Sequence, residues 1–269
     1  MPSRYGFVVA QSQDSHIVAS LNDIPLRDTI MPVDRYKSST VPPDHWLMPG
    51  PNVMTLEVVR GVVGPETAIN ANLWDGDTKE HLAEIHWPKD FSSEPAELAH
   101  GGRPITASVA KAFVLPDSHP RPFYADAPVR DVPLRGDPQT WAPIRAFHDA
   151  FTRGDKAGVL EGLSLRLEVW ARAYQSKNAD PGAVAAELDR NVPAPFKMLP
   201  LDPDATVFEP IAGGKMLRVR RLDRLPVIAG KCVDEDTTPA DLGEPRGPQP
   251  AKLETPFLVF LDNRYRIVF

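Results

Sequence analysis

The sequence has 269 residues, of which 42% are hydrophobic and 25% are charged, a balance that excludes general disorder. Its formal net charge of −6 argues against a protein whose whole surface binds nucleic acid or anionic lipid. Its one cysteine, Cys232, excludes an internal disulfide and a cysteine-based zinc cluster.

The length and the prolines together indicate how the chain is organised. Two domains are expected, because a domain usually contains about 100 to 200 residues. The 30 prolines fall mostly between apolar runs, which favours short strands and shaped loops over a helical bundle. No run approaches the ~18 apolar residues of a membrane-spanning helix, and the N-terminal apolar stretch lacks a cleavage pattern. We therefore expect no membrane insertion and a cytoplasmic location.

Short β-prone segments follow one another through the first half of the chain. Residues 4 to 11 and 16 to 21 predict strands, and Asn22 and Asp23 after them predict a two-residue hairpin turn, since both tolerate positive φ. Further strands are predicted in alternating runs at about residues 66 to 74, 80 to 87 and 104 to 115. Each half-buried strand needs a second sheet over its apolar face, so an antiparallel β-sandwich domain is predicted for residues 1 to 136.

The stretch WLMPGPNVMTLEV, residues 46 to 58, joins a Pro-Gly break to an alternating run. Gly50 permits a turn and Asn52 can hydrogen-bond the turning backbone. Turn chemistry explains these residues, so the stretch is interpreted as the entry of a strand and not as an active-site wall. LNDIPL followed by LMPGPNVMTLEV resembles the hairpin and strand entry of jelly-roll and immunoglobulin-like sandwich domains. That resemblance implies binding or scaffolding more often than catalysis.

Helical spacing replaces the alternation after the proline-rich segment 116 to 138. Asp137 is a predicted N-cap, Gly154 a predicted C-cap and Asp155 the next N-cap. The predicted buried face of the first helix consists of Trp141, Ile144, His148 and Phe151, and that of the second of Leu160, Leu163, Leu167, Trp170 and Tyr174. A third short helix is predicted to begin at Asp180.

Strands return in the last third of the chain. Hairpins are predicted around Gly213 and Gly214 and around Asp262 and Asn263, and residues 224 to 229 are expected to continue the first of them. Residues 137 to 269 therefore predict an α+β domain with helices packed on an antiparallel sheet. The order of elements and the phrase IRAFHDAFTRGDKAGVL resemble the nuclear transport factor 2-like (cystatin-related) cone.

The residues that usually signal catalysis or metal binding are missing from the sequence. It contains no nucleophile elbow, zinc-protease, EF-hand or dinucleotide-binding motif, so no cofactor is expected. His81 and His86 lie five residues apart, which in a regular strand places them on opposite faces and predicts no shared metal ion. Acidic neighbours such as Asp234 would raise the pKa of the Cys232 thiol, so we expect no nucleophile there.

Four arginines form the most distinctive predicted surface. Arg218 and Arg220 share one strand face, as do Arg264 and Arg266. If the two strands lie near each other, four guanidinium groups crowd one sheet face unless acidic partners compensate them. The alternative is a solvated face balanced by the protein's own carboxylates, such as Glu209.

Two functions remain open from the sequence. The first is a non-catalytic protein-interaction module that binds another protein, with an acidic surface, through the four arginines, and with no role in nucleic-acid binding. The second is implied by the cone resemblance: a small-molecule-binding protein or enzyme with His148, Glu168 and Tyr174 as pocket residues. Core packing explains His148 and Tyr174 equally well.

Overall fold

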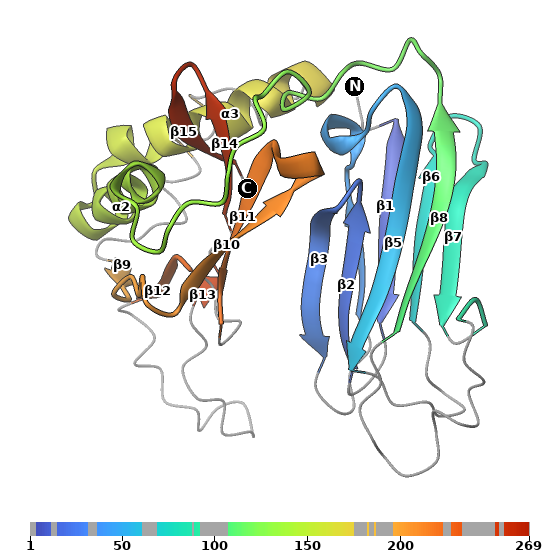
Figure 1. The fold of residues 1–269 in the computed structure, drawn as a ribbon, viewed down its shortest axis with the longest axis horizontal. Coiled ribbons are helices and arrows are strands. Elements are labelled where there is room, and N and C mark those ends of the chain that lie inside the picture. Colours follow the sequence, from blue (N-terminus) through green and yellow to red (C-terminus); the bar gives the residue numbers. More distant parts are fainter. Residues whose placement is uncertain are drawn as a thin grey trace. The chain divides into compact units, whose positions relative to one another are not determined.

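The computed structural model describes most of the chain. The described residues are 4–11, 15–31, 37–60, 69–87, 89–91, 107–174, 182, 186, 196–222, 227–232, 251–252 and 256–268. Its contacts divide the chain into two compact units, Met1–Ala125 (unit 1) and Asp126–Phe269 (unit 2). The proline-rich segment that follows Asp126 therefore belongs to unit 2. Antiparallel sheets and two long helices make up the described part, which is an α+β protein (Figure 1).

The described residues of unit 1 form two four-stranded antiparallel sheets. The first has the order β4-β1-β6-β7, formed by Lys37–Val41, Tyr5–Gln11, Ile69–Asp75 and His81–Trp87. The second has the order β3-β2-β5-β8, formed by Ile24–Met31, Ser15–Leu21, Gly50–Arg60 and Ala107–Leu115. A short 3-10 helix, η1 (Asp44–Trp46), precedes β5.

Both sheets of unit 1 contribute side chains to one hydrophobic core. Phe7 and Leu73 come from the first sheet, and Ile17 and Leu56 from the second; all four are fully buried. Burying one such side chain stabilises the fold by about 1.5–3 kcal/mol. The core therefore depends on both layers.

The β2–β3 hairpin and the entry of β5 form as predicted. Asn22 and Asp23 have φ values of 51° and 63°, the left-handed conformation that a tight hairpin turn requires. Gly50 also has a positive φ, 77°. Asn52 is 1% exposed and bonds the turning backbone: its Nδ2 donates to the Met48 and Gly50 carbonyls, and its Oδ1 accepts from the Met48 amide. These contacts confirm a structural role for the stretch.

In the described part of unit 2, two long helices accompany two antiparallel sheets. The helices are α2 (Pro138–Arg153) and α3 (Lys156–Tyr174). The larger sheet has the order β10-β11-β14-β15, formed by Thr206–Ile211, Met216–Arg221, Phe257–Leu261 and Arg264–Val268, with η3 (Ala212–Gly214) between the first two strands. The smaller has the order β13-β12-β9, formed by Ala251–Lys252, Ala229–Cys232 and Phe196–Met198.

Capping residues set the ends of the helices as predicted. The Asp137 carboxylate accepts from the Thr140 amide at 2.8 Å, which satisfies a free donor of the first turn of α2. Gly154 ends that helix with a φ of 65°, and Asp155 then accepts from the Gly158 amide at 3.0 Å. Short-range chemistry alone therefore predicted these boundaries.

The buried faces of the helices differ from the prediction at several positions. In α2, Phe147 is buried, whereas His148 is half-buried. In α3, the buried residues are Val159, Leu165 and Val169, and the predicted leucines are only half-buried. The cause is that α3 is apolar around most of its circumference, so spacing does not single out one face. The Tyr174 side chain lies outside the described residues, and so does the third predicted helix except for Gly182 and Ala186, which are helical.

Gly162 shows how closely the two helices approach each other. A Cβ atom at Gly162 would overlap the ring of Phe147, and one at Gly158 would lie 2.8 Å from the Ala150 Cβ. The glycines, four residues apart, therefore turn toward α2 and allow the helix backbones to come together.

The strand after β11 does not continue the first hairpin of unit 2. β12 pairs with β9 and β13, while β11 pairs with β10 and β14. Residues 227 to 229 therefore do not continue the meander, because β12 pairs with strands other than β11, and the first part of the expected range 224 to 229 lies outside the described residues. Among the helices that the structure describes, none has the length and apolar character needed to cross a membrane.

Candidate functional site

The cross-strand register places the four predicted arginines on one face of the larger sheet of unit 2. Arg218 is opposite Phe257, which is opposite Val268; Arg266 and Arg264 are opposite Val259 and Leu261. Directly opposed residues project to the same side of a sheet. Residues two apart on a strand also project to the same side, so Arg218 and Arg220 share a side, as do Val268, Arg266 and Arg264. Because Phe257 links Arg218 to Val268, all four arginines project from the same face.

Glu209 pairs with both arginines on the half of this face that lies on β11. The Arg220 Nε donates to Glu209 Oε1 at 2.9 Å, and the Arg218 Nη1 lies 3.6 Å from Oε2 of the same carboxylate. The side chains of Arg218 and Arg220 are only 12% and 23% exposed. This half of the face matches the alternative interpretation, in which carboxylates of the protein balance the arginines.

Arg264 and Arg266 on β15 face three residues on one stripe of α3. Arg266 Nη2 donates to Ser164 Oγ at 3.1 Å and to Glu168 Oε1 at 2.8 Å, and its side chain is 14% exposed. Arg264 Nη2 lies 3.8 Å from Glu161 Oε1, which is beyond hydrogen-bonding distance. Arg264 is 63% exposed and Glu161 is 71% exposed. The two neighbouring arginines therefore differ sharply: one is fixed and one is loosely held.

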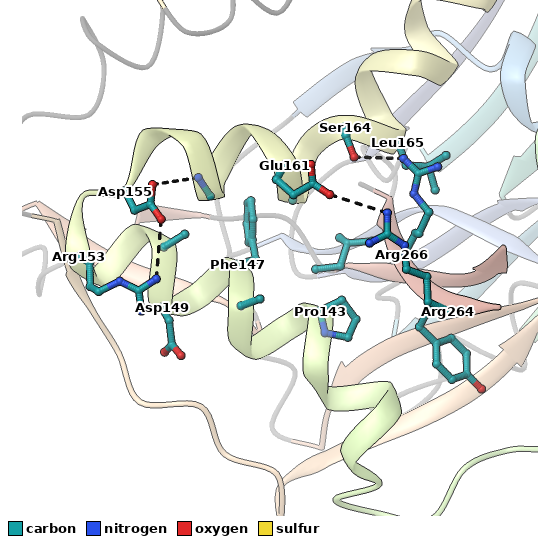
Figure 2. A pocket seen from close by; sticks show the side chains of 16 residues that line it. Pro143, Phe147, Asp149, Arg153, Asp155, Glu161, Ser164, Leu165, Arg264 and Arg266 are labelled. Atoms are coloured by element: carbon teal, nitrogen blue, oxygen red, sulfur yellow. Dashed lines mark hydrogen bonds and ion pairs between the residues drawn. The ribbon is translucent and has the colours of Figure 1, made fainter. Parts of the chain in front are cut away.

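A groove of about 430 Å³ lies between α2, α3 and β15 (Figure 2). Phe147 and Ala150 of α2 and Leu165 of α3 provide apolar walls, and Arg264 and Arg266 line it from β15. Its volume lies within the roughly 300–1,000 Å³ of small-ligand sites. We call this the α2–α3 groove.

Charged groups lie toward both ends of the α2–α3 groove. Asp149, Arg153 and Asp155 occupy the end near the α2–α3 turn, and Arg264 and Arg266 the opposite end, with Phe147 between them (Figure 2). Arg153 Nη2 is 3.8 Å from Asp155 Oδ2. The groove thus combines an apolar centre with polar ends, which suits a ligand of the same pattern.

The three predicted pocket residues do not come together in this groove. His148 contacts the Leu199 carbonyl through Nε2 at 2.8 Å, and neither it nor Glu168 lines the groove. Glu168 instead holds Arg266 in place. Glu161 and Ser164 were not among the predicted residues, although their spacing with Glu168 marks one helix stripe.

The two histidines of β7 correct a geometric expectation. His81 Nδ1 and His86 Nε2 both lie 3.3 Å from the same oxygen of Glu84, so the opposite-face argument is wrong. The pairing of β6 with β7 shifts register between Leu73 and Trp74, and a bulge of this kind breaks the regular alternation. In the described part of the chain, no group of three or more His, Cys, Asp and Glu side chains is placed to hold a metal ion.

Comparison with known proteins provides no assignment for this chain. No family model, no curated protein and no solved structure matches it. The chemistry of the described residues is therefore the basis for any functional proposal.

Proposed function

We propose that the protein is a non-catalytic protein-interaction module that binds a partner with an acidic surface through the arginine-bearing sheet face of unit 2. The observation that carries the proposal is the exposure of Arg264. Its side chain is 63% exposed, and the Glu161 carboxylate lies 3.8 Å away, too far for a hydrogen bond. An exposed ion pair of this kind contributes about 0–1 kcal/mol. Arg264 can therefore exchange Glu161 for a carboxylate of the partner at little cost.

The four arginines have different roles in partner binding. Arg218 and Arg220 are largely covered and paired with Glu209, which supports a structural role in holding β10 to β11. Arg266 is held by Ser164 and Glu168 and presents a fixed positive charge beside Arg264. Recognition of the partner then centres on β15.

The domain organisation is part of the same proposal. The shared core of the two sheets in unit 1 supports a β-sandwich domain, similar to jelly-roll or immunoglobulin-like domains. Helices that precede an antiparallel sheet in unit 2 support a domain similar to nuclear transport factor 2. The second, three-stranded sheet is a departure from a simple cone. A cytoplasmic location and the absence of nucleic-acid binding stay predictions.

A capture experiment with a charge reversal tests the proposed function. The immobilised full chain is incubated with lysate of its native cell, and captured proteins are compared with those of the Arg264→Glu variant. Arg172→Glu, an exposed change on α3, is the matched control. We expect a partner that the parent and the control retain and that Arg264→Glu loses without a change in Tm. Undiminished capture by Arg264→Glu contradicts the proposal.

The α2–α3 groove favours a second candidate function, the binding of a small molecule by unit 2. Ala146 is exposed and lines the groove, so Ala146→Leu narrows it with little effect on the core. A metabolite that raises the Tm of the parent but not of this variant supports the second function. A metabolite that raises both equally counts against the groove as its site.

A further inference from the structure

We propose that the α2–α3 groove binds a short acidic segment of a partner protein, and that Glu161 occupies the position of the segment's carboxylate until it arrives. This inference rests on the proposed function and specifies what is recognised. Arg264, Arg266 and Ser164 form the end of the groove at which the carboxylate of the segment binds.

The donors at this end are only partly used. Both contacts of Arg266 involve Nη2, so its Nε and Nη1 have no acceptor among the described residues. The Arg264 side chain makes no hydrogen bond within the same part of the chain, and its nearest carboxylate, that of Glu161, lies 3.8 Å away. A guanidinium group carries five N–H donors in a planar fork that matches a carboxylate. Together the two arginines offer enough donors for an incoming carboxylate.

The shape of the groove favours a peptide over a small carboxylate. Phe147 separates the arginine end from the second charged end at Asp149, Arg153 and Asp155 (Figure 2). An extended segment can place an acidic side chain at the arginines, an apolar one over Phe147 and a polar one at the far end. A small monocarboxylate would fill only one end.

Glu161 acts as an internal competitor in this arrangement. It lies on α3 beside Arg264, and both side chains are mostly exposed, so their ion pair is weak. A ligand carboxylate competes with it for the positive charge of Arg264. Removing the charge at residue 161 should therefore tighten binding, a result that a merely structural ion pair would not produce.

The test measures fluorescence anisotropy of a labelled peptide with alternating glutamate and leucine, added to the full chain. We expect Glu161→Gln to tighten binding about twofold to fivefold, the equivalent of one exposed ion pair. Arg264→Gln should weaken binding about tenfold, as expected for hydrogen bonds to a charged group. Arg172→Gln and Asp204→Asn are exposed control variants and should bind like the parent.

Two further ligands identify the chemistry that is recognised. A peptide with glutamine in place of glutamate should not bind, and succinate should compete only weakly. Equal binding of the glutamine peptide, or no tightening by Glu161→Gln, overturns the inference. If succinate binds as tightly as the peptide, the groove recognises a small carboxylate, and the inference of a peptide ligand is overturned.

The failure of this inference can be distinguished from the failure of the proposed function. If the acidic peptide does not bind but a captured partner is still lost with Arg264→Glu, only the groove inference is overturned. If the partner is retained by Arg264→Glu, the proposed function itself is overturned.

Discussion

Asn22 Nδ2 donates to Asn52 Oδ1 at 2.8 Å and so links the β2–β3 turn to the first residues of β5. Asn22 also accepts from the Val53 amide at 3.0 Å, and Asn52 bonds Met48 and Gly50. Two amide side chains therefore satisfy the backbone at one end of unit 1.

Asn52→Ala should destabilise unit 1 by about 3 kcal/mol, because it removes the side-chain partner of several half-buried polar groups. Denaturant unfolding of the full chain measures this loss. Thr55→Ala, a half-buried position on the same strand, is the control and should cost much less. A loss below that of the control would show that water replaces the amide.

Gly162→Ala should destabilise unit 2 by about 1–3 kcal/mol, because the new methyl group overlaps the ring of Phe147. In an isolated helix the same substitution would stabilise the helix by about 1 kcal/mol, so the sign of the change in unfolding free energy distinguishes the two cases. The double variant with Phe147→Leu should recover part of the loss in a double-mutant cycle. An additive result in that cycle would contradict the contact.

Tyr124→Phe should reduce the loss of stability at alkaline pH. Burial raises the pKa of Tyr124 well above its ordinary value of 10.0, and its hydroxyl donates to the Trp46 carbonyl at 2.8 Å. The unfolded chain therefore loses this proton more readily, so stability is fully present below pH ~10 and falls above it, by up to about 1.4 kcal/mol per pH unit. The free energy of unfolding of the parent and of the variant is measured at pH 8 and pH 11. If the variant loses as much stability between these pH values as the parent, the prediction is contradicted.

Asp137→Ala should destabilise unit 2 by about 1 kcal/mol at neutral pH, since it removes the N-cap of α2. Hydrogen bonds from the Thr140 side chain and amide lower the pKa of Asp137 below its usual 3.8. A lowered carboxyl pKa stabilises the fold above the unfolded value, and that contribution disappears as the pH falls through the folded value. The difference between parent and variant should therefore shrink in acid, as unfolding at pH 7 and pH 2 would reveal.

Short-range patterns in the sequence determined several features of this protein by themselves. Asn22 and Asp23 adopt the positive φ of a tight turn, and Asp137 and Gly154 cap α2, because the chemistry involved extends over only a few neighbouring residues. The alternating run noted in β5 corresponds to buried Met54, Leu56 and Val58 between more exposed residues, since the period of a strand is two residues.

Only the tertiary structure decided which distant residues meet. The sequence alone placed Arg264 and Arg266 on one strand face, but the distances to Glu161 and Glu168 depend on how α3 packs beside β15. The pairing of β12 with β9 depends on a strand far along the chain, and the bulge near His81 depends on how β7 pairs with β6. Local conformation is set by neighbouring atoms, whereas contacts of this kind are set by packing of the whole chain, which spacing alone does not contain.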